Sequence, residues 1–170
     1  MNRRKFFAAG AVAGLSGSFL SDLSAQEKHK PFTLKCAPHF GMFKNSAPGG
    51  LLDELRFAHD HGFRAWEDNG MSARPVGEQE AIGAEMEKLG ITMGVVSAKT
   101  GIKELNFASK DKEAHQVVLD QIAATVDVAK RVNAGYMTLV SGQVDPRWDR
   151  ETQYANCIDL LRRAVEIVEP

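Results

Sequence analysis

Several polar residues of this sequence follow short apolar runs, where a parallel sheet would place chemistry. Glu67 and Asp68 come directly after Trp66, and a carboxylate beside that apolar ring could hold a substrate hydroxyl or carry a proton. An imidazole could bind an anionic or hydroxylated substrate. The candidate substrate-binding residues each lie near the carboxyl end of an expected strand, and they are His39, Phe40, Glu67 and Ser97.

Each of these candidates also has a purely structural interpretation. Two adjacent carboxylates commonly open a solvated turn, in which Asp68 would cap the loop. A single histidine near aromatic residues, such as His39, is more often packed and hydrogen-bonded than bound to a ligand. Lys99 could meet a carboxylate or a phosphate, or it could lie in solvent. The sequence pattern assigns no catalytic residue and no metal ligand.

The other histidines and the absent motifs narrow the chemistry further. His59 and His61 are two residues apart near an expected helix end, so they do not share a helical face and favour a charge role over metal binding. His115 is expected on a helix surface. The sequence has no GxxxxGK[ST], GxGxxG after a strand, CxxC, HExxH or GxSxG. The common nucleotide, redox, zinc-protease and hydrolase functions are therefore not indicated.

The apolar patterns predict strands that alternate with helices. The expected strands are residues 32–37, 63–67, 91–97 and 136–140, and helical spacing follows each of them. Asp111 should cap the third helix, and a glycine should end each of three helices, at Gly62, Gly90 and Gly135. This order is typical of an α/β fold with parallel strands. Four βα units fit either a small doubly wound sheet or half of a (β/α)8 barrel, which usually takes about 250 residues.

Length, composition and charge exclude several classes of protein. The chain has 170 residues, 44% hydrophobic and 25% charged, as expected for a folded domain. Its net charge of -1 gives no indication of a nucleic-acid partner. Cys36 and Cys157 are too few for a disulfide scaffold and are expected to be buried thiols, with a disulfide between them as the alternative.

The first 25 residues have the layout of an export signal, which leaves residues 26–170 for the fold. Arg3, Arg4 and Lys5 precede an apolar stretch, which ends in small residues up to Ala25. The two arginines followed by Phe6 and Phe7 resemble a twin-arginine signal, so we expect export to the periplasm; a general secretory signal or an uncleaved anchor is the alternative. The apolar stretch is short and rich in Gly and Ser, so no membrane span is expected after signal removal.

Six segments resemble a known family when their order and spacing are taken together. They are APHFGMF (37–43), WEDNGM (66–71), RPV (74–76), MGV (93–95), VAKRVNA (128–134) and VSGQVD (140–145). The resemblance is to hydroxypyruvate isomerase-like members of the xylose isomerase-like TIM barrels. It runs from about Phe32 to Pro170, and this chain would supply about four βα units, the N-terminal half of the barrel.

The resemblance implies an isomerase that interconverts the aldehyde and ketone forms of a sugar or small hydroxy-carbonyl compound. The step would be proton transfer through an enediolate, often with a divalent metal. In the family the catalytic glutamates and the metal ligands come from later strands. We therefore expect the catalytic residues and any metal site to lie outside this chain, and the first four strand ends to line the substrate pocket.

Two other hypotheses remain open from the sequence. The chain could be a non-catalytic exported protein that binds a sugar or hydroxy acid through His39 and Glu67. Alternatively, a half barrel could complete itself as a homo-oligomer, because its open sheet edges and apolar face would favour pairing.

Overall fold

The computed structural model describes residues 29–169, so the expected signal segment 1–25 lies outside the described residues. The elements follow in the order α1 (Leu51–Asp60), β1 (Ala65–Trp66), η1 (Met71–Ala73), α2 (Val76–Leu89), β2 (Thr92–Met93), β3 (Val95–Ser97), α3 (Lys112–Arg131), β4 (Tyr136–Thr138) and α4 (Arg150–Val168). This is the alternation of strands and helices that the sequence predicts.

The described strands form two parallel pairs, β1 with β2 and β3 with β4. β1 pairs with β2, with Trp66 opposite Met93, and β3 pairs with β4, with Ser97 opposite Thr138. β2 and β3 are two parts of one extended segment, interrupted at Gly94, whose N–H donates to the Trp66 carbonyl at 2.8 Å. The expected strand 91–97 is therefore present as two short strands, each with a different partner.

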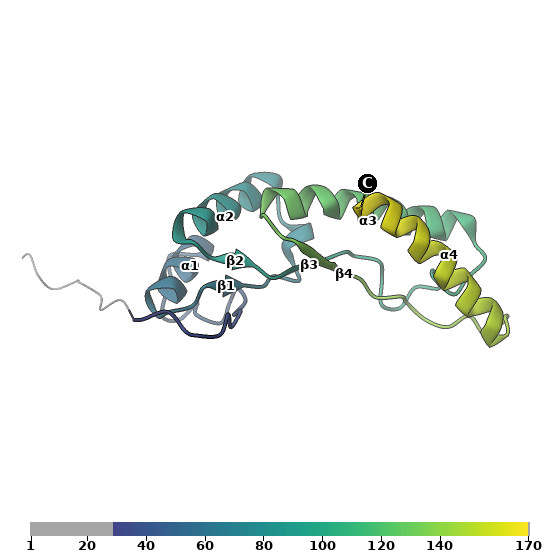
Figure 1. The fold of residues 1–170 in the computed structure, drawn as a ribbon, viewed down its shortest axis with the longest axis horizontal. Helices are drawn as coiled ribbons and strands as arrows, with labels where there is room; N and C mark the ends of the chain where they lie inside the picture. The colour runs from purple at the N-terminus through teal and green to yellow at the C-terminus, as the bar shows by residue number, and fades with distance from the viewer. Residues whose placement is uncertain (1–28, 170) are drawn as a thin grey trace, which may run out of the picture.

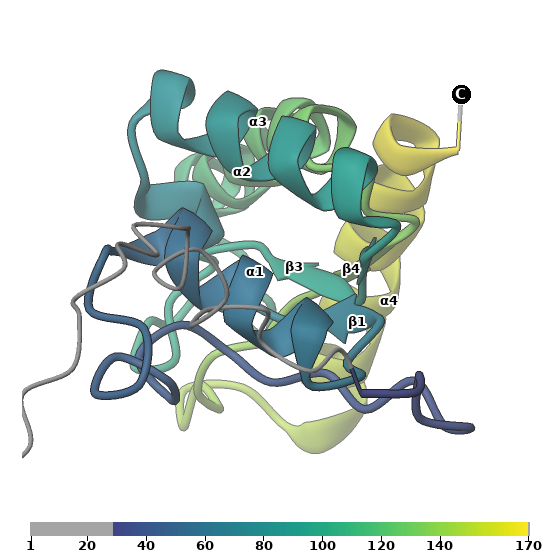
Figure 2. The same ribbon diagram turned by 90° about the vertical axis from the view of Figure 1, so that its left-hand side faces the viewer.

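The helices form a layer on one side of these strands. Each helix contacts the next along the chain, α1 with α2, α2 with α3, and α3 with α4. Figures 1 and 2 both show α2 and α3 on one side of the strands. Figure 1 shows α4 at the opposite end of the molecule from α1. A row of parallel strands with crossover helices on one face is the arrangement of half a (β/α)8 barrel.

Two buried clusters hold the helices to the strands. The first surrounds Trp66, which is fully buried, and includes Leu55 of α1 and Ile82 of α2. The second surrounds Phe107 and joins Ile122 of α3 to Leu160 of α4. The apolar positions spaced at three and four residues along α1, α2 and α3 thus face the core, as their spacing predicts.

The helix ends confirm two of the three expected glycine stops. Gly62 and Gly90 have φ values of 95° and 65°, in the left-handed region that suits glycine. The prediction for Gly135 was wrong: α3 ends at Arg131, and Asn133 takes the left-handed conformation with φ 52°. Asparagine tolerates this region because its short side chain can bond locally, so glycine was not needed there. Asp111 caps α3 as expected and accepts hydrogen bonds from the N–H groups of Glu113 and Ala114.

The expected first strand, residues 32–37, is not formed. These residues are exposed, and the Cys36 N–H donates to the Leu34 carbonyl, a local turn in place of a ladder bond. The pairing occurs later, as a single bridge between His39 and Glu67. The apolar run therefore predicts pairing in the correct region of the chain, but the residue that pairs is His39, which lies outside 32–37.

Both cysteines are free thiols, and their expected burial is wrong for Cys36. Cys36 is exposed in the unpaired segment before His39, while Cys157 on α4 is half-buried. Burial raises the pKa of the Cys157 thiol. Among the described helices, none is both long and apolar enough to cross a membrane.

The apolar stripe of α4 lies largely outside the core. Leu160 and Ala164 are buried against α3, but residues of the expected stripe are 40–54% exposed: Tyr154, Ile158, Leu161, Val165 and Val168. Tyr136 on β4 is 76% exposed as well. Within residues 29–169, α4 therefore contributes to the stability of the fold through the side that packs against α3.

Neighbouring leucines on α4 provide a matched test of this packing. Leu160→Ala should lower the free energy of unfolding by about 2–5 kcal/mol, because Leu160 is fully buried and its loss leaves a cavity. Leu161→Ala should change it by no more than about 0.5 kcal/mol, since Leu161 is 41% exposed. Urea unfolding measures both variants. Equal losses would show that the exposed stripe is covered in solution.

Candidate functional site

The strand ends bring an imidazole and a carboxylate to neighbouring backbone positions. His39 and Glu67 form a parallel bridge, and the Glu67 N–H donates to the Pro38 carbonyl at 2.9 Å. His39 is exposed and Glu67 is half-buried, so solvent and ligands can reach both side chains. Asn69 donates a hydrogen bond to Glu67 Oε1 at 3.3 Å. Two of the four sequence-predicted residues thus lie side by side at the carboxyl edge.

The ring nitrogens of His39 have different roles. Nδ1 lies 3.1 Å from the Phe40 carbonyl, which can only accept, so Nδ1 carries a proton in that contact. In the neutral ring Nε2 is then an acceptor for a hydroxyl group, and in the imidazolium it is a donor. The hydrogen bond to Phe40 therefore fixes the tautomer that His39 presents.

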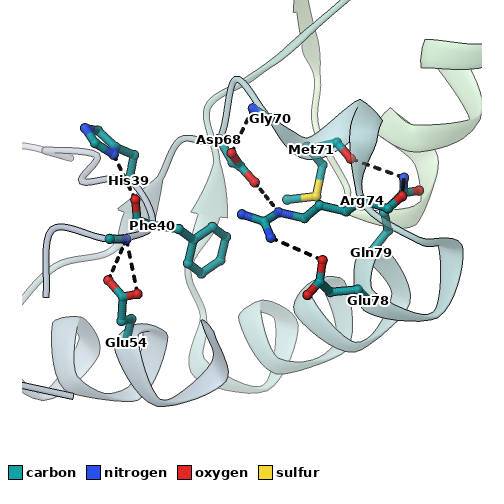
Figure 3. A network of polar contacts seen from close by, with 10 residues as sticks. His39, Phe40, Glu54, Asp68, Gly70, Met71, Arg74, Glu78 and Gln79 are labelled. Carbon is teal, nitrogen blue, oxygen red and sulfur yellow. Dashed lines mark hydrogen bonds and ion pairs between the residues drawn. The ribbon is translucent and has the colours of Figure 1, made fainter. Parts of the chain in front are cut away.

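Phe40 links this edge to the core. Its ring lies 4.8 Å from the ring of the buried Trp66. On another side the guanidinium carbon of Arg74 lies 4.8 Å from the centroid of the Phe40 ring, and Figure 3 shows these two side chains together. A guanidinium over an aromatic face is attracted by the ring quadrupole. Phe40 thus has a packing partner on one side and a cation on the other, which leaves it as a fixed wall beside His39.

Arg74 in turn joins the loop after β1 to α2. Its Nε donates to Asp68 Oδ2 at 2.6 Å, and its Nη1 donates to Glu78 at 3.1 Å. The other oxygen of Asp68 accepts the Gly70 N–H at 2.8 Å, so Asp68 caps the loop. The structural interpretation of Asp68 is confirmed, and Asp68 is buried and not available to a substrate.

The loop that follows His39 is held by a buried carboxylate on α1. Glu54, shown in Figure 3, accepts hydrogen bonds from the N–H of Gly41, at 2.9 and 3.1 Å. It also accepts one from the N–H of Phe43, at 3.0 Å. Glu54 is only 4% exposed. Hydrogen bonds to a charged acceptor are stronger than neutral ones, so Glu54 fixes the backbone that carries His39 and Phe40.

Ser97 joins this edge through a backbone contact. The Ser72 hydroxyl of η1 donates to the Ser97 carbonyl at 2.8 Å, which ties the end of β3 to the loop after β1. The loop after Ser97 is tied to the segment that follows β4 in the same way, since Thr100 Oγ1 donates to the Val140 carbonyl at 2.6 Å. The ends of the strands therefore form one connected edge, with Ser97 beside the part that holds Glu67.

A hollow of about 520 Å³ lies at the end of β4. It is bordered by residues 141–144 and by Arg150, Tyr154 and Cys157 of α4. Asp145, which follows, is fully buried and accepts two hydrogen bonds from the Arg147 guanidinium, at 2.7 and 2.8 Å. This contact holds the pKa of the Asp145 carboxyl below its ordinary value, so Asp145 is an ionised part of the turn into α4.

Sequence reasoning missed Glu54, Ser72 and Arg74. Glu54 had a signal, because it is four residues before Ala58 and three after Leu51, on the apolar face of the helix. A carboxylate at such a position needs buried donors. Ser72 and Arg74 act through contacts across the fold, to Ser97 and Phe40, and no local pattern indicates those.

The remaining histidines are placed as follows. His61 stacks on Phe57 with 3.9 Å between the ring centroids, and His59 Nδ1 lies 3.1 Å from Asp60 Oδ1. The expectation that His115 lies on the surface was wrong, because it is only 6% exposed, between α3 and α4. Within residues 29–169, no three His, Cys, Asp or Glu side chains gather in a way that could hold a metal ion.

The sequence matches a known protein family over most of its length. Residues 55–170 match the family described as xylose isomerase-like TIM barrel. The chain belongs to this family. The parallel strands and crossover helices of residues 29–169 are part of its barrel, as the resemblance of the sequence segments implied. No protein of curated function matches the chain.

Solved structures with the same fold are longer than this chain, which covers about half of each. A family 2 AP endonuclease from Brucella melitensis has a TM-score of 0.61 and 19% identity, over 79% of this chain and 50% of that one. A 3-keto-D-glucoside 4-epimerase from E. coli has a TM-score of 0.55 and 16% identity, over 79% and 51%. A D-psicose 3-epimerase, crystallised in the presence of D-fructose, has a TM-score of 0.55 and 12% identity, over 70% and 43%. These likenesses show the fold, and this chain spans about half the length of each structure.

The Glu54 carboxylate gives a direct test of how the edge is held. Glu54→Gln should weaken the hold on the loop by about 1–3 kcal/mol, because a neutral amide replaces a charged acceptor of buried N–H groups. Amide hydrogen exchange at Gly41 and Phe43 should speed up by about tenfold or more. Glu80→Gln, at an exposed position on α2, is the control and should leave these two amides unchanged. Unchanged exchange in Glu54→Gln would mean that other contacts hold the loop.

Proposed function

We propose that this chain forms the substrate-binding half of an isomerase or epimerase that acts on a sugar or a small hydroxy-carbonyl compound, of the hydroxypyruvate isomerase type. The observation that carries the proposal is the bridge between His39 and Glu67 at the carboxyl edge of a xylose isomerase-like barrel. In such barrels the substrate site lies at this edge.

The two side chains suit a compound that carries several hydroxyl groups. The Glu67 carboxylate is an acceptor, and neutral His39 also presents an acceptor at Nε2, since Nδ1 is used on Phe40. Adjacent hydroxyls of a sugar or hydroxy acid could donate to both. Phe40, packed on Trp66, offers an apolar wall for the carbon skeleton.

Two of the similar solved structures are sugar epimerases, which supports the same class of substrate here. Isomerisation and epimerisation next to a carbonyl both need a proton to leave one carbon and to return through an enediolate. The step requires a base, an acid and a donor to the developing oxyanion. We propose that His39, Phe40, Glu67 and Ser97 bind and orient the substrate, and we assign the proton transfer to none of them.

A divalent metal is implied by the resemblance, and its fit can be tested on the donor set. The described residues provide no cluster of three metal-ligating side chains. The carboxylates of Asp68 and Glu54 are already used on Arg74 and on backbone N–H groups. The part of the barrel in residues 29–169 therefore does not fit a metal.

Export is part of the same proposal. Residues 1–25 would direct the protein to the periplasm, which the layout of Arg3, Arg4 and the apolar stretch supports. Intact mass of the periplasmic protein tests this, since cleavage after Ala25 removes those residues and retention of Met1 would contradict it.

The test of function is exchange of a substrate proton with solvent deuterium. The protein isolated from its natural host is incubated in D₂O with hydroxypyruvate or D-fructose, and deuterium in the substrate is followed by NMR. Glu67→Gln should lower kcat/KM by about tenfold or more, because a charge-assisted hydrogen bond to the substrate is lost. Glu87→Gln, exposed on α2, serves as the control and should keep the original rate.

Two other outcomes are informative. Binding of these compounds, lost in Glu67→Gln, without any exchange would support the non-catalytic binding protein instead. An equal rate of deuterium exchange in Glu67→Gln and Glu87→Gln would show that Glu67 does not contact the substrate.

A further inference from the structure

A second hollow lies away from the strand ends, between the start of α3 and the middle of α4. Its volume is about 640 Å³, within the range of about 300–1,000 Å³ common for small-molecule pockets. Lys110, Lys112 and His115 border it from the α3 side, and Asp159 and Arg163 border it from α4. The hollow belongs to the helical layer and contains none of the residues of the proposed substrate site.

The charges around this hollow favour an anion. Three cationic side chains face one carboxylate, that of Asp159. Lys110 is held at the rim, with its Nζ 4.0 Å from the centroid of the Trp148 ring. Lys112 and Arg163 have no ion-pair or hydrogen-bond partner through their side chains within residues 29–169. Their charges are thus available to a ligand.

His115 supplies the independent observation. It is 94% buried, and its Nε2 has no hydrogen-bond partner among the described residues. Buried polar atoms in folded proteins are nearly always paired, so an orphaned one marks a place where a ligand or an ordered water completes the pairing. His115 borders the same hollow as Lys112 and Arg163.

Backbone N–H groups at the N-terminus of α3 and the nearby Asn156 amide already have hydrogen-bond partners within the protein. The Asp111 carboxylate already accepts the N–H groups of Glu113 and Ala114, at 2.9 and 3.3 Å. The Asn156 amide is also used, since its Nδ2 donates to the Ala108 carbonyl at 2.9 Å. A ligand would therefore be held by the side chains of Lys110, Lys112 and Arg163, beside the buried ring of His115.

We infer that this hollow between α3 and α4 binds a phosphate group, either as inorganic phosphate or as part of a phosphorylated small molecule. A tetrahedral oxyanion offers several acceptors, which match the guanidinium of Arg163 and the ammonium groups of Lys110 and Lys112. The site is separate from the sugar-binding edge, so it stands or falls independently of the proposed isomerase.

The test is a titration of the purified protein followed by NMR. Inorganic phosphate and glucose 6-phosphate are added in separate runs, with glucose as the unphosphorylated comparison. The ring signals of His115 should move to saturation with the phosphate compounds and stay in place with glucose. Tighter binding of glucose 6-phosphate than of inorganic phosphate would identify a phosphorylated small molecule as the source of the group.

Variants of opposite sign make the test specific. Arg163→Gln and Lys112→Gln should each weaken phosphate binding by about tenfold, because each removes a charge-assisted contact. Asp159→Asn should tighten it, since the only carboxylate at the rim is removed. Lys103→Gln, an exposed lysine in the loop after β3, should have no effect.

Two results would overturn the inference. One is the absence of any saturable change at His115 with either phosphate compound. The other is equal affinity in the original protein and in Arg163→Gln, Lys112→Gln and Lys103→Gln, which would show that the lysines and Arg163 do not form a site.

Discussion

Parallel pairing of consecutive strands is the constraint on which the rest of this structure depends. Glu67 pairs with His39, Met93 with Trp66, and Thr138 with Ser97, so each strand starts and ends level with its neighbour. Two parallel neighbours need a crossover, which a helix provides, so the chain must return to the same edge before each new strand. The polar residues that follow each strand are thereby collected along one edge.

The strands themselves are very short, and the loops at this edge are fixed by side chains. Glu54 holds the loop of His39 and Phe40, Arg74 holds the loop of Asp68, and Thr100 holds the loop after β3 against Val140. A buried carboxylate destabilises the fold unless it accepts hydrogen bonds, and the carboxylates of Glu54 and Asp68 both do so. The edge is therefore built in advance of any ligand, which reduces the entropy lost on binding.

The sequence predicts those features of the structure that depend on the chemistry of residues close together in the chain. The cap at Asp111 and the turns at Gly62 and Gly90 follow from the properties of single residues and are confirmed. The edge position of His39, Phe40, Glu67 and Ser97 follows from the alternation of strands and helices.

Contacts across the fold account for the rest. The apolar run 32–37 forms no strand. Its Phe32 N–H donates to the Gly62 carbonyl, but the bridge to the segment of β1 forms only at His39 and Glu67. His115 was expected on the surface, since nothing local shows that α4 packs over that part of α3. Arg74 lies on Phe40 through a fold that brings residues 34 positions apart into contact, and no periodicity indicates such a pair.

We propose that the edge around His39 and Glu67 is the binding site for a hydroxylated small molecule. A crystal structure of the protein grown with D-fructose or hydroxypyruvate tests it most directly. Ligand density is expected against the Glu67 carboxylate and the Nε2 of His39, beside the ring of Phe40. Ordered ligand elsewhere, with Glu67 and His39 in contact only with solvent, would contradict it.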